Sequence, residues 1–264
     1  QALQVLVPAG WFLPTTPGTR FATLGGSVAN DVHGKNHHSA GTFGDAVTRL
    51  KLHRTDGSTR ELTPGDPLFH ATVGGLGLTG VIEWVEFRAT PIPSSDLDAQ
   101  DFSFEHVSDY FDLAVEKKDA AEHTMAWIDC ITGGARLGRG ILSCANWNLH
   151  GELKAHREEP RKKMPIDAPG FALNALTVRA FNSIRHDLKT MRSGPYRTHY
   201  EPFLYPLDAI AHWNRLYGVD GFYQYQCIVP SSSMRDAVPE LLAEIAKDGD
   251  GSFLAVLKSC GGLS

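Results

Sequence analysis

The sequence GGSVANDVHGKNHHSAGTFGD, residues 25–45, combines five glycines with three histidines. Three interpretations are open: a metal site, histidines with a structural role, or a backbone cradle for a large cofactor. Glycines leave backbone N–H groups uncovered, and such groups bind phosphate oxygens without a basic side chain. The residues between the glycines are mostly small, which lets a planar ring approach closely. The segment therefore favours a dinucleotide with a flat redox ring.

The histidines are the basis of the metal alternative. His33 and His37 are four residues apart and would share one face of a helix. Gly34 and Asn36 disfavour a helix at this point, and the sequence contains no carboxylate-bearing zinc motif such as HExxH. A zinc or iron site and purely structural histidines remain the alternatives to a cofactor cradle.

A second glycine-rich stretch, GGLGLTG at residues 74–80, matches the pattern G-x-G-x-x-G through Gly75, Gly77 and Gly80. A Rossmann fingerprint needs a strand before it and a helix after it, so that pyrophosphate meets a helix N-terminus. Here a helical pattern precedes and a strand pattern follows. The stretch therefore argues against a Rossmann site, although its glycines still permit close backbone approach.

The composition is that of a globular protein with one large or two modest domains: 264 residues, 42% hydrophobic and 21% charged. A net charge of −5 gives no electrostatic footprint for nucleic acid. The four cysteines form no CxxC pair, and a buried free thiol is expected for each. No run of about 20 apolar residues could span a membrane. The sequence starts without methionine and stops after a strand-like run, so we expect a piece of a longer chain.

The first third of the sequence contains three local signals. Residues 47–63 alternate apolar and polar side chains around an Asp-Gly pair, which predicts a β-hairpin. Asp66 as N-cap and Pro67 at the first helical position predict a short helix that ends at Gly74. Residues 80–93 are predicted to form a strand.

A polar stretch rich in proline, serine and aspartate, residues 91–99, is the best internal boundary. It divides the sequence into residues 1–93 and residues 94–264. The second part is predicted to contain, in order, helix 104–118, strands 123–131 and 138–147, a surface excursion 151–172, helix 206–218, strand 221–230, helix 232–249 and strand 252–260. The expected fold class is α+β, with an antiparallel sheet that has helices on one face.

Two long motifs carry a family resemblance. LPTTPGTRFATLGGSVANDVHGKNHHSAGTFGD (residues 13–45) and DPLFHATVGGLGLTGVI (residues 66–82) resemble the FAD-binding domain of vanillyl-alcohol-oxidase-type (VAO/PCMH-type) flavoproteins. The later stretches AWIDCI, YPLDAIAHWNRLYGVDGFYQYQCIVP and SFLAVLK resemble a substrate domain of that family. The resemblance implies that residues 1–93 are the C-terminal part of an FAD-binding domain. Residues 94–264 would then be a truncated substrate, or cap, domain.

The resemblance also implies FAD as the cofactor and assigns residues to its site. The positions that match FAD contacts are Gly18, Thr23, Leu24, Gly25, Gly26, Asn30, Asp31, Val32, His33 and Ile82. The positions that match the substrate side of the flavin are Lys35, Gln224, Gln226 and Lys258, with Lys35 near a substrate phosphate. Lys258, Gln226 and His33 are the candidate catalytic residues, and no metal ligand is implied.

The activity that the resemblance implies is oxidation of a sugar hydroxyl to a ketone. The implied substrate is a polyprenylphosphoryl-ribose-like lipid, and the reaction would be the first half of an epimerisation towards a cell-wall arabinan precursor. A separate NAD(P)H-dependent reductase would be the partner. A lipid-linked substrate implies at most peripheral membrane contact, on a cytoplasmic or a periplasmic protein.

Departures from the family pattern keep other functions open. Leu204 stands where a family member has a tyrosine, and residues 185–194 lack a tryptophan found there. An aldonolactone or alditol oxidase of the same flavin fold is the nearest alternative. A metal hydrolase built on the histidines and a flavin-free, non-catalytic fragment are alternatives of other classes. Lys258 lies at a strand end and could instead extend to solvent. Gln226 and Gln224 share one face of the predicted strand, and this polar face could meet solvent instead of lining a pocket.

Overall fold

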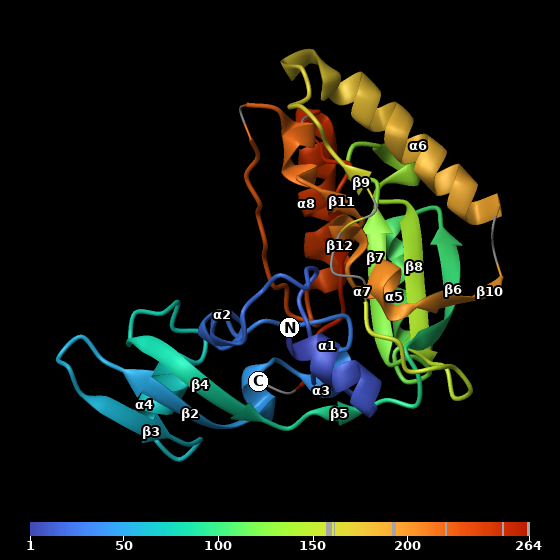
Figure 1. The fold of residues 1–264 in the computed structure, drawn as a ribbon. Helices are drawn as coiled ribbons and strands as arrows, with labels where there is room; N and C mark the ends of the chain where they lie inside the picture. The colour runs from blue at the N-terminus through green and yellow to red at the C-terminus, as the bar shows by residue number, and fades with distance from the viewer. Residues whose placement is uncertain (157–159, 161, 192–193, 220, 250, 263–264) are drawn as a thin grey trace.

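The centre of the structure is a five-stranded antiparallel sheet (Figure 1). The computed structural model describes residues 1–156, 160, 162–191, 194–219, 221–249 and 251–262. The strands of this sheet follow the order β10 (Pro195–His199), β6 (Asp96–Phe104), β8 (Gly140–Trp147), β7 (His123–Ile128) and β12 (Ala255–Leu257). The predicted strands at 123–131, 138–147 and 252–260 are confirmed, the last as a strand of three residues. The α+β class is confirmed as well.

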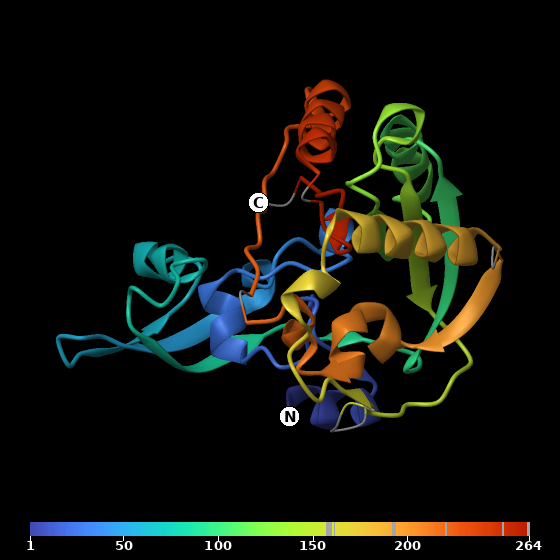
Figure 2. The same ribbon diagram turned by 90° about the horizontal axis from the view of Figure 1, so that it is seen from above.

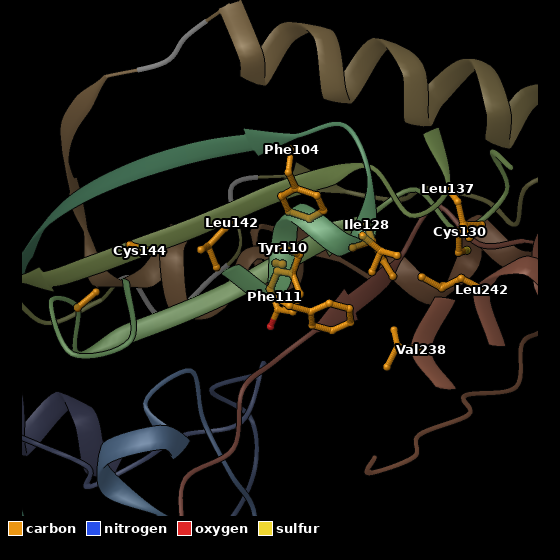
Figure 3. Packing of buried hydrophobic residues seen from close by; sticks show 13 residues of the cluster. Phe104, Tyr110, Phe111, Ile128, Cys130, Leu137, Leu142, Cys144, Val238 and Leu242 are labelled. Carbon is orange, nitrogen blue, oxygen red and sulfur yellow. The ribbon is translucent and has the colours of Figure 1, made fainter. Parts of the chain in front are cut away.

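Strand register sorts the side chains of this sheet onto two faces. Phe102 pairs with Leu142, and Ala126 pairs with Leu142 from the other side, so these three side chains share one face. On this face α5 (Val107–Lys117) and α8 (Met234–Asp248) cover a buried apolar cluster. Figure 3 shows this cluster, which includes Phe104, Tyr110, Phe111, Ile128, Leu142, Val238 and Leu242. The helices predicted over 104–118 and 232–249 are thereby confirmed.

The opposite face of the sheet is covered by a helix that was not predicted, α6 (Ala175–Met191). Arg185 of α6 lies over the Trp127 ring, and the Lys189 ammonium pairs with Asp101 at 2.5 Å. Figure 2 shows α6 (gold) and α5 (green) on opposite sides of the sheet. The expectation that the helices lie on one face is therefore wrong. The buried positions of α6 are Val178, Asn182 and His186, and two polar residues among three interrupt the apolar face that would have indicated a helix.

A smaller three-stranded sheet is formed by the first part of the chain. Its order is β3 (Thr59–Leu62), β2 (Val47–His53) and β4 (Val81–Phe87), and the β2–β3 pair confirms the predicted hairpin. α2 (Leu24–Ala29) packs on β4. Another apolar cluster, which includes Val28, Leu50 and Phe69, lies against this sheet. α4 (Pro67–Thr72) follows Asp66 as predicted, but the Asp66 carboxylate accepts from the Thr63 N–H at 2.8 Å and does not cap the helix.

The first residues of the chain pack with the second part of the sequence. α1 (Ala2–Leu6) and β1 (Trp11–Phe12) contribute Leu3 and Phe12 to a cluster with Leu97, Trp147 and Tyr200. β1 pairs with β5 (Thr90–Pro91). One apolar cluster thus contains residues from both sides of position 93, and the division into 1–93 and 94–264 stays a prediction.

The remaining elements are short. They are η1 (Val7–Ala9), α3 (His37–Ala40), η2 (Gly44–Ala46), η3 (Gly134–Arg136), β9 (Lys162–Lys163), η4 (Gly170–Ala172), α7 (Tyr200–Leu204), η5 (Pro206–Ala209), β11 (Ile210–Ala211) and η6 (Trp213–Tyr217). Parts of the predicted excursion 151–172, at 157–159 and 161, lie outside the described residues. No helix in the described ranges is long and apolar enough to cross a membrane.

Two expectations from local pattern are wrong. Residues 206–218 are not one helix: η5 and η6 are separated by β11 and by His212, whose φ is +56°. Residues 221–230 are extended but pair with no strand in the described chain. The stretch 91–99 contains the start of β6 at Asp96, and its role as a boundary stays a prediction.

The cysteines are free thiols, but they are not all buried. Cys130 and Cys144 are buried, as expected, whereas Cys227 and Cys260 are exposed. Cys227 lies on the unpaired segment 221–230, and its exposure follows from the missing strand.

Candidate functional site

The glycine-rich segment, residues 25–45, is called the strap below. Its shape depends on Gly34. A Cβ at Gly34 would lie 2.4 Å from the Thr15 Oγ1 and 2.9 Å from the Thr16 carbonyl oxygen, so a larger residue would displace the backbone. Next to it, His33 forms an isolated bridge with Thr42. The strap is fixed to the central sheet by the Thr124 N–H, which donates to the Lys35 carbonyl at 2.7 Å. Gly34 thus holds His33 at a defined place beside the sheet.

Three of the predicted site residues meet at this strap. The Lys258 amine contacts the His33 Nδ1 at 2.7 Å and donates to the Gly34 carbonyl at 3.3 Å. The Gln226 amide lies 3.5 Å from the His33 Nε2. Lys258 follows β12 directly, whereas Gln226 lies on the extended segment 221–230. The fold therefore brings the three candidate catalytic residues together from distant parts of the chain.

The surroundings of His33 keep its imidazole neutral. Burial, followed by the nearby Lys258 and His37, lowers the pKa of His33 from 6.5 to about 4, against an opposing effect of Asp31. Burial also lowers the pKa of Lys258. Because Lys258 donates to Nδ1, the ring proton of neutral His33 belongs on Nε2, and this N–H can be accepted by the Gln226 amide only through its Oε1 atom. The cluster thus contains one cationic amine with a lowered pKa, one neutral imidazole and one amide.

Lys35 takes a different position from these three residues. It is 9% exposed, and its ammonium donates to the carbonyl oxygens of Phe203 and of Leu204, the latter at 3.2 Å. The ammonium also lies 5.3 Å from the centre of the Phe203 ring. Burial and then Lys258 lower the pKa of Lys35 to about 7. The structure therefore places this ammonium on backbone carbonyls of α7.

The predicted substrate residue Gln224 is exposed. It shares the extended segment with Gln226, but no described contact joins it to His33 or Lys258. Its role at the site stays a prediction.

Apart from Gly18, the predicted FAD positions lie on α2 and its N-cap, on the residues that follow α2, and on β4. Thr23 caps α2 by accepting from the Gly26 N–H at 2.9 Å. Gly25 approaches β4 so closely that a Cβ there would lie 3.6 Å from the Ile82 Cβ, while a Cβ at Gly18 would meet nothing within 4 Å. Asp31 has a φ of +42° and accepts from the Gly44 N–H at 2.9 Å.

These positions fit a cofactor that is held by backbone groups. Leu24, Val32 and Ile82 pack their side chains against the apolar cluster of the small sheet, and the Val32 backbone is already bonded to Ser27 and Phe43, which leaves the first turn of α2, at Leu24 and Gly25, for a ligand. Asn30 is exposed and its amide donates to the Gly26 carbonyl at 2.9 Å. The set contains no charge that would repel a pyrophosphate apart from Asp31, whose carboxylate is already bonded to Gly44.

Sequence reasoning missed two histidines near this site. The His37 ring packs edge-on against His33 at 5.6 Å, and the Gly261 N–H donates to its Nδ1 at 3.1 Å. His123 begins β7 and is buried. The spacing of His37 to His33 was interpreted only as a possible metal site, and nothing in the alternating strand pattern distinguishes His123. Among the described residues, no group of three or more histidines, cysteines or carboxylates is placed to hold a metal ion.

Comparison with known proteins identifies relatives over nearly the whole chain, although no family model matches it. The chain is 33% identical over 276 residues to the decaprenylphosphoryl-β-D-ribose oxidase of Mycolicibacterium smegmatis, a match that covers 99% of the chain and 59% of that relative. It is 30% identical over 274 residues to the "Uncharacterized protein in mprA 5'region" of Streptomyces coelicolor, covering 98% of the chain and 73% of that relative. A shorter match, 31% identical over 84 residues, is to a "Putative D-arabinono-1,4-lactone oxidase" of Neurospora crassa and covers 31% of the chain and 15% of that relative.

Two of these three relatives are named as oxidases. The chain belongs to one family with the Streptomyces protein and is similar over nearly its whole length to the Mycolicibacterium oxidase. It spans 59% of the length of the Mycolicibacterium relative.

Proposed function

We propose that this protein is part of an FAD-dependent oxidoreductase that oxidises a sugar hydroxyl to a ketone. The observation that carries the proposal is the meeting of Lys258 and Gln226 with His33 on a glycine-rich strap. We propose a polyprenylphosphoryl-ribose-like substrate, because the Mycolicibacterium relative is named for decaprenylphosphoryl-β-D-ribose. The reaction would be the first half of an epimerisation in the formation of a cell-wall arabinan precursor.

The domain roles follow from the same proposal. Residues 1–93 would be part of a VAO/PCMH-type FAD-binding domain, and residues 94–264 would be the substrate domain. The positions proposed to hold FAD are Gly18, Thr23, Leu24, Gly25, Gly26, Asn30, Asp31, Val32, His33 and Ile82. FAD, when bound, supplies the acceptor for a hydride from the carbinol carbon.

The residues of this chain would orient the hydroxyl and manage its proton. Lys258 has a pKa lowered by burial, which increases the fraction of neutral amine that can take a hydroxyl proton. In its charged form the same group would hold an anionic substrate. The Gln226 amide can bind a sugar hydroxyl as donor or acceptor. His33 positions the Lys258 amine through Nδ1. We propose Gln224 as a further substrate contact. A contact from Lys35 to a substrate phosphate would require its ammonium to leave the Phe203 and Leu204 carbonyls.

A ketone product would need a second enzyme. We propose an NAD(P)H-dependent reductase as the partner that returns the keto sugar to an alcohol of inverted configuration. A lipid-linked substrate would bring the protein to a membrane surface as a peripheral protein.

An aldonolactone oxidase of the same flavin fold is the second candidate. It is favoured by the partial match to the Neurospora protein, whose name specifies a D-arabinono-1,4-lactone. The two candidates differ in substrate and not in the proposed chemistry, so a direct comparison of substrates separates them.

The test uses the full-length protein, its absorption spectrum and one variant. Added FAD should give a bound flavin spectrum, and a prenylphosphoryl ribose should bleach it under anaerobic conditions faster than an aldonolactone does. Lys258→Ala should retain the flavin spectrum and lose the bleaching, because the group that takes the hydroxyl proton is gone. Lys247→Ala, at an exposed lysine of α8, is the matched control and should bleach normally.

The outcomes separate the proposals. A protein that stays colourless with FAD would leave the flavin-free alternative. Faster bleaching by the aldonolactone would identify the second candidate. Equal bleaching rates in Lys258→Ala and the parent protein would remove Lys258 from the mechanism.

A further inference from the structure

A small cavity with a largely apolar lining and a few polar groups lies between the strap and the central sheet, apart from the cluster at His33. Its volume is about 10 Å³, which is room for about one water molecule. Polar lining is contributed by Lys35, Asn36 and His123, and apolar lining by Trp147 and Leu204. A cavity of this size is too small for an organic ligand, and the polar groups in its lining give a single water molecule possible hydrogen-bond partners.

His123 is the first of two groups that point to a ligand in this cavity. It is 4% exposed, and neither ring nitrogen has a hydrogen-bond partner among the described residues. The nearest carboxylate oxygen, Glu122 Oε1, is 3.7 Å from the His123 Nε2, which is too long for a hydrogen bond, and it accepts from the Trp147 indole at 3.2 Å. Burial, then Lys35 and His38, lower the pKa of His123 to about 3, so its imidazole is neutral. A neutral imidazole offers one N–H donor and one acceptor.

Lys35 is the second group. Its ammonium has three N–H donors, and within the described chain it is given two acceptors, the carbonyls of Phe203 and Leu204. One donor is left for the cavity that Lys35 lines. A buried donor and a buried imidazole without partners would each cost free energy, and both face the same space.

We propose that this cavity is a binding site for a single water molecule that bridges Lys35 and His123. The water accepts from the third N–H of the charged Lys35 and donates to the unprotonated nitrogen of His123. When Lys35 is neutral, its lone pair takes a hydrogen bond from the same water, which reorients without leaving. One molecule thereby satisfies Lys35 in both charge states and links the strap to β7.

The decisive comparison is between two substitutions of His123. In a dry cavity His123→Leu would stabilise the protein, because it removes two unpaired nitrogens from the interior. With a bridging water the same change removes a partner of the water and leaves Lys35 unsatisfied. We therefore expect His123→Leu to raise the unfolding equilibrium constant about tenfold. His123→Gln keeps a donor and an acceptor and should have a smaller effect.

A double-mutant cycle and a crystal structure complete the test. In a Lys35→Met background the effect of His123→Leu should shrink, because the bridge is already broken. A high-resolution structure of the protein should show one water peak within hydrogen-bond distance of both Lys35 Nζ and a His123 nitrogen. A stabilised His123→Leu variant, additive effects in the cycle, or a cavity without a water peak would each overturn the proposal.

Discussion

The Nδ1 atom of His33 accepts from the Lys258 amine across 225 residues of sequence, and this one contact organises the candidate site. The family resemblance predicted both residues, together with Gln226, as parts of one site. It could not predict that the Lys35 ammonium turns to the carbonyls of α7, because burial depends on packing from distant elements. The histidines that first suggested a metal prove to be of different kinds. His33 faces an amine, and His37 packs against its ring.

The depressed pKa of His33 makes stability depend on pH. In the unfolded chain His33 takes up a proton near pH 6.5, whereas in the folded protein it does so near pH 4. Between these values the unfolded state binds more protons, so the contribution of His33 is fully present above pH 6.5 and is lost as the pH falls to 4. His33→Gln should therefore reduce the loss of stability between pH 7 and pH 5.

The measurement is the urea midpoint at the two pH values. His150→Gln, at an exposed histidine, is the matched control and should leave the pH dependence of the parent protein unchanged. An identical pH dependence in His33→Gln and the parent would contradict a neutral His33.

At the scale of elements, the local sequence pattern correctly predicted the elements that form from residues close together in the sequence. The hairpin of β2 and β3 and the helices α5 and α8 belong to this group. The local pattern was wrong where a strand must pair with a partner that is distant in the sequence. Residues 221–230 alternate like a strand, but alternation predicts only an extended chain, and no described strand lies beside them. It missed α6, which meets the sheet through Arg185 and Lys189.

The strap offers a prediction at this scale, through a pair of glycines. Gly34→Ala would place a Cβ against Thr15 Oγ1 and the Thr16 carbonyl and should cost about 1–3 kcal/mol of stability, as overpacking does. Gly18→Ala meets nothing within 4 Å and should leave stability unchanged. Thermal unfolding of the two variants checks this. A Gly34→Ala variant as stable as Gly18→Ala would show that the strap adjusts freely.

At the scale of the whole molecule, the question is how the two parts of the sequence depend on each other. Phe12 lies near the start of the chain, yet its ring packs edge-on against Trp147 at 5.1 Å and Tyr200 at 5.0 Å. A reading by composition placed a boundary at residue 93, and it could not detect that the first twelve residues complete a cluster at the end of the central sheet.

The packing of Phe12 predicts that a substitution in the two-residue strand β1 strongly lowers the stability of the protein. Phe12→Ala should cost about 3–5 kcal/mol, because it empties a site enclosed by two aromatic rings. Trp11→Ala is the matched control from the same two-residue strand, where Trp11 is 44% exposed, and it should cost much less. Urea unfolding followed by circular dichroism measures both. Equal losses would mean that Phe12 does not connect the two parts.

The candidate site is formed by the strap on one side and by the extended segment 221–230 on the other, and the two differ in how their backbones are held. His33 lies on a strap that is bonded to the central sheet, whereas the backbone of residues 221–229 makes no hydrogen bond to other described residues. The segment is instead held by side chains, with Phe222 against the Tyr217 ring and Val229 against the apolar cluster of the central sheet. We therefore expect the strap to determine which ligands bind. The segment that carries Gln226 should accommodate ligands of different shapes.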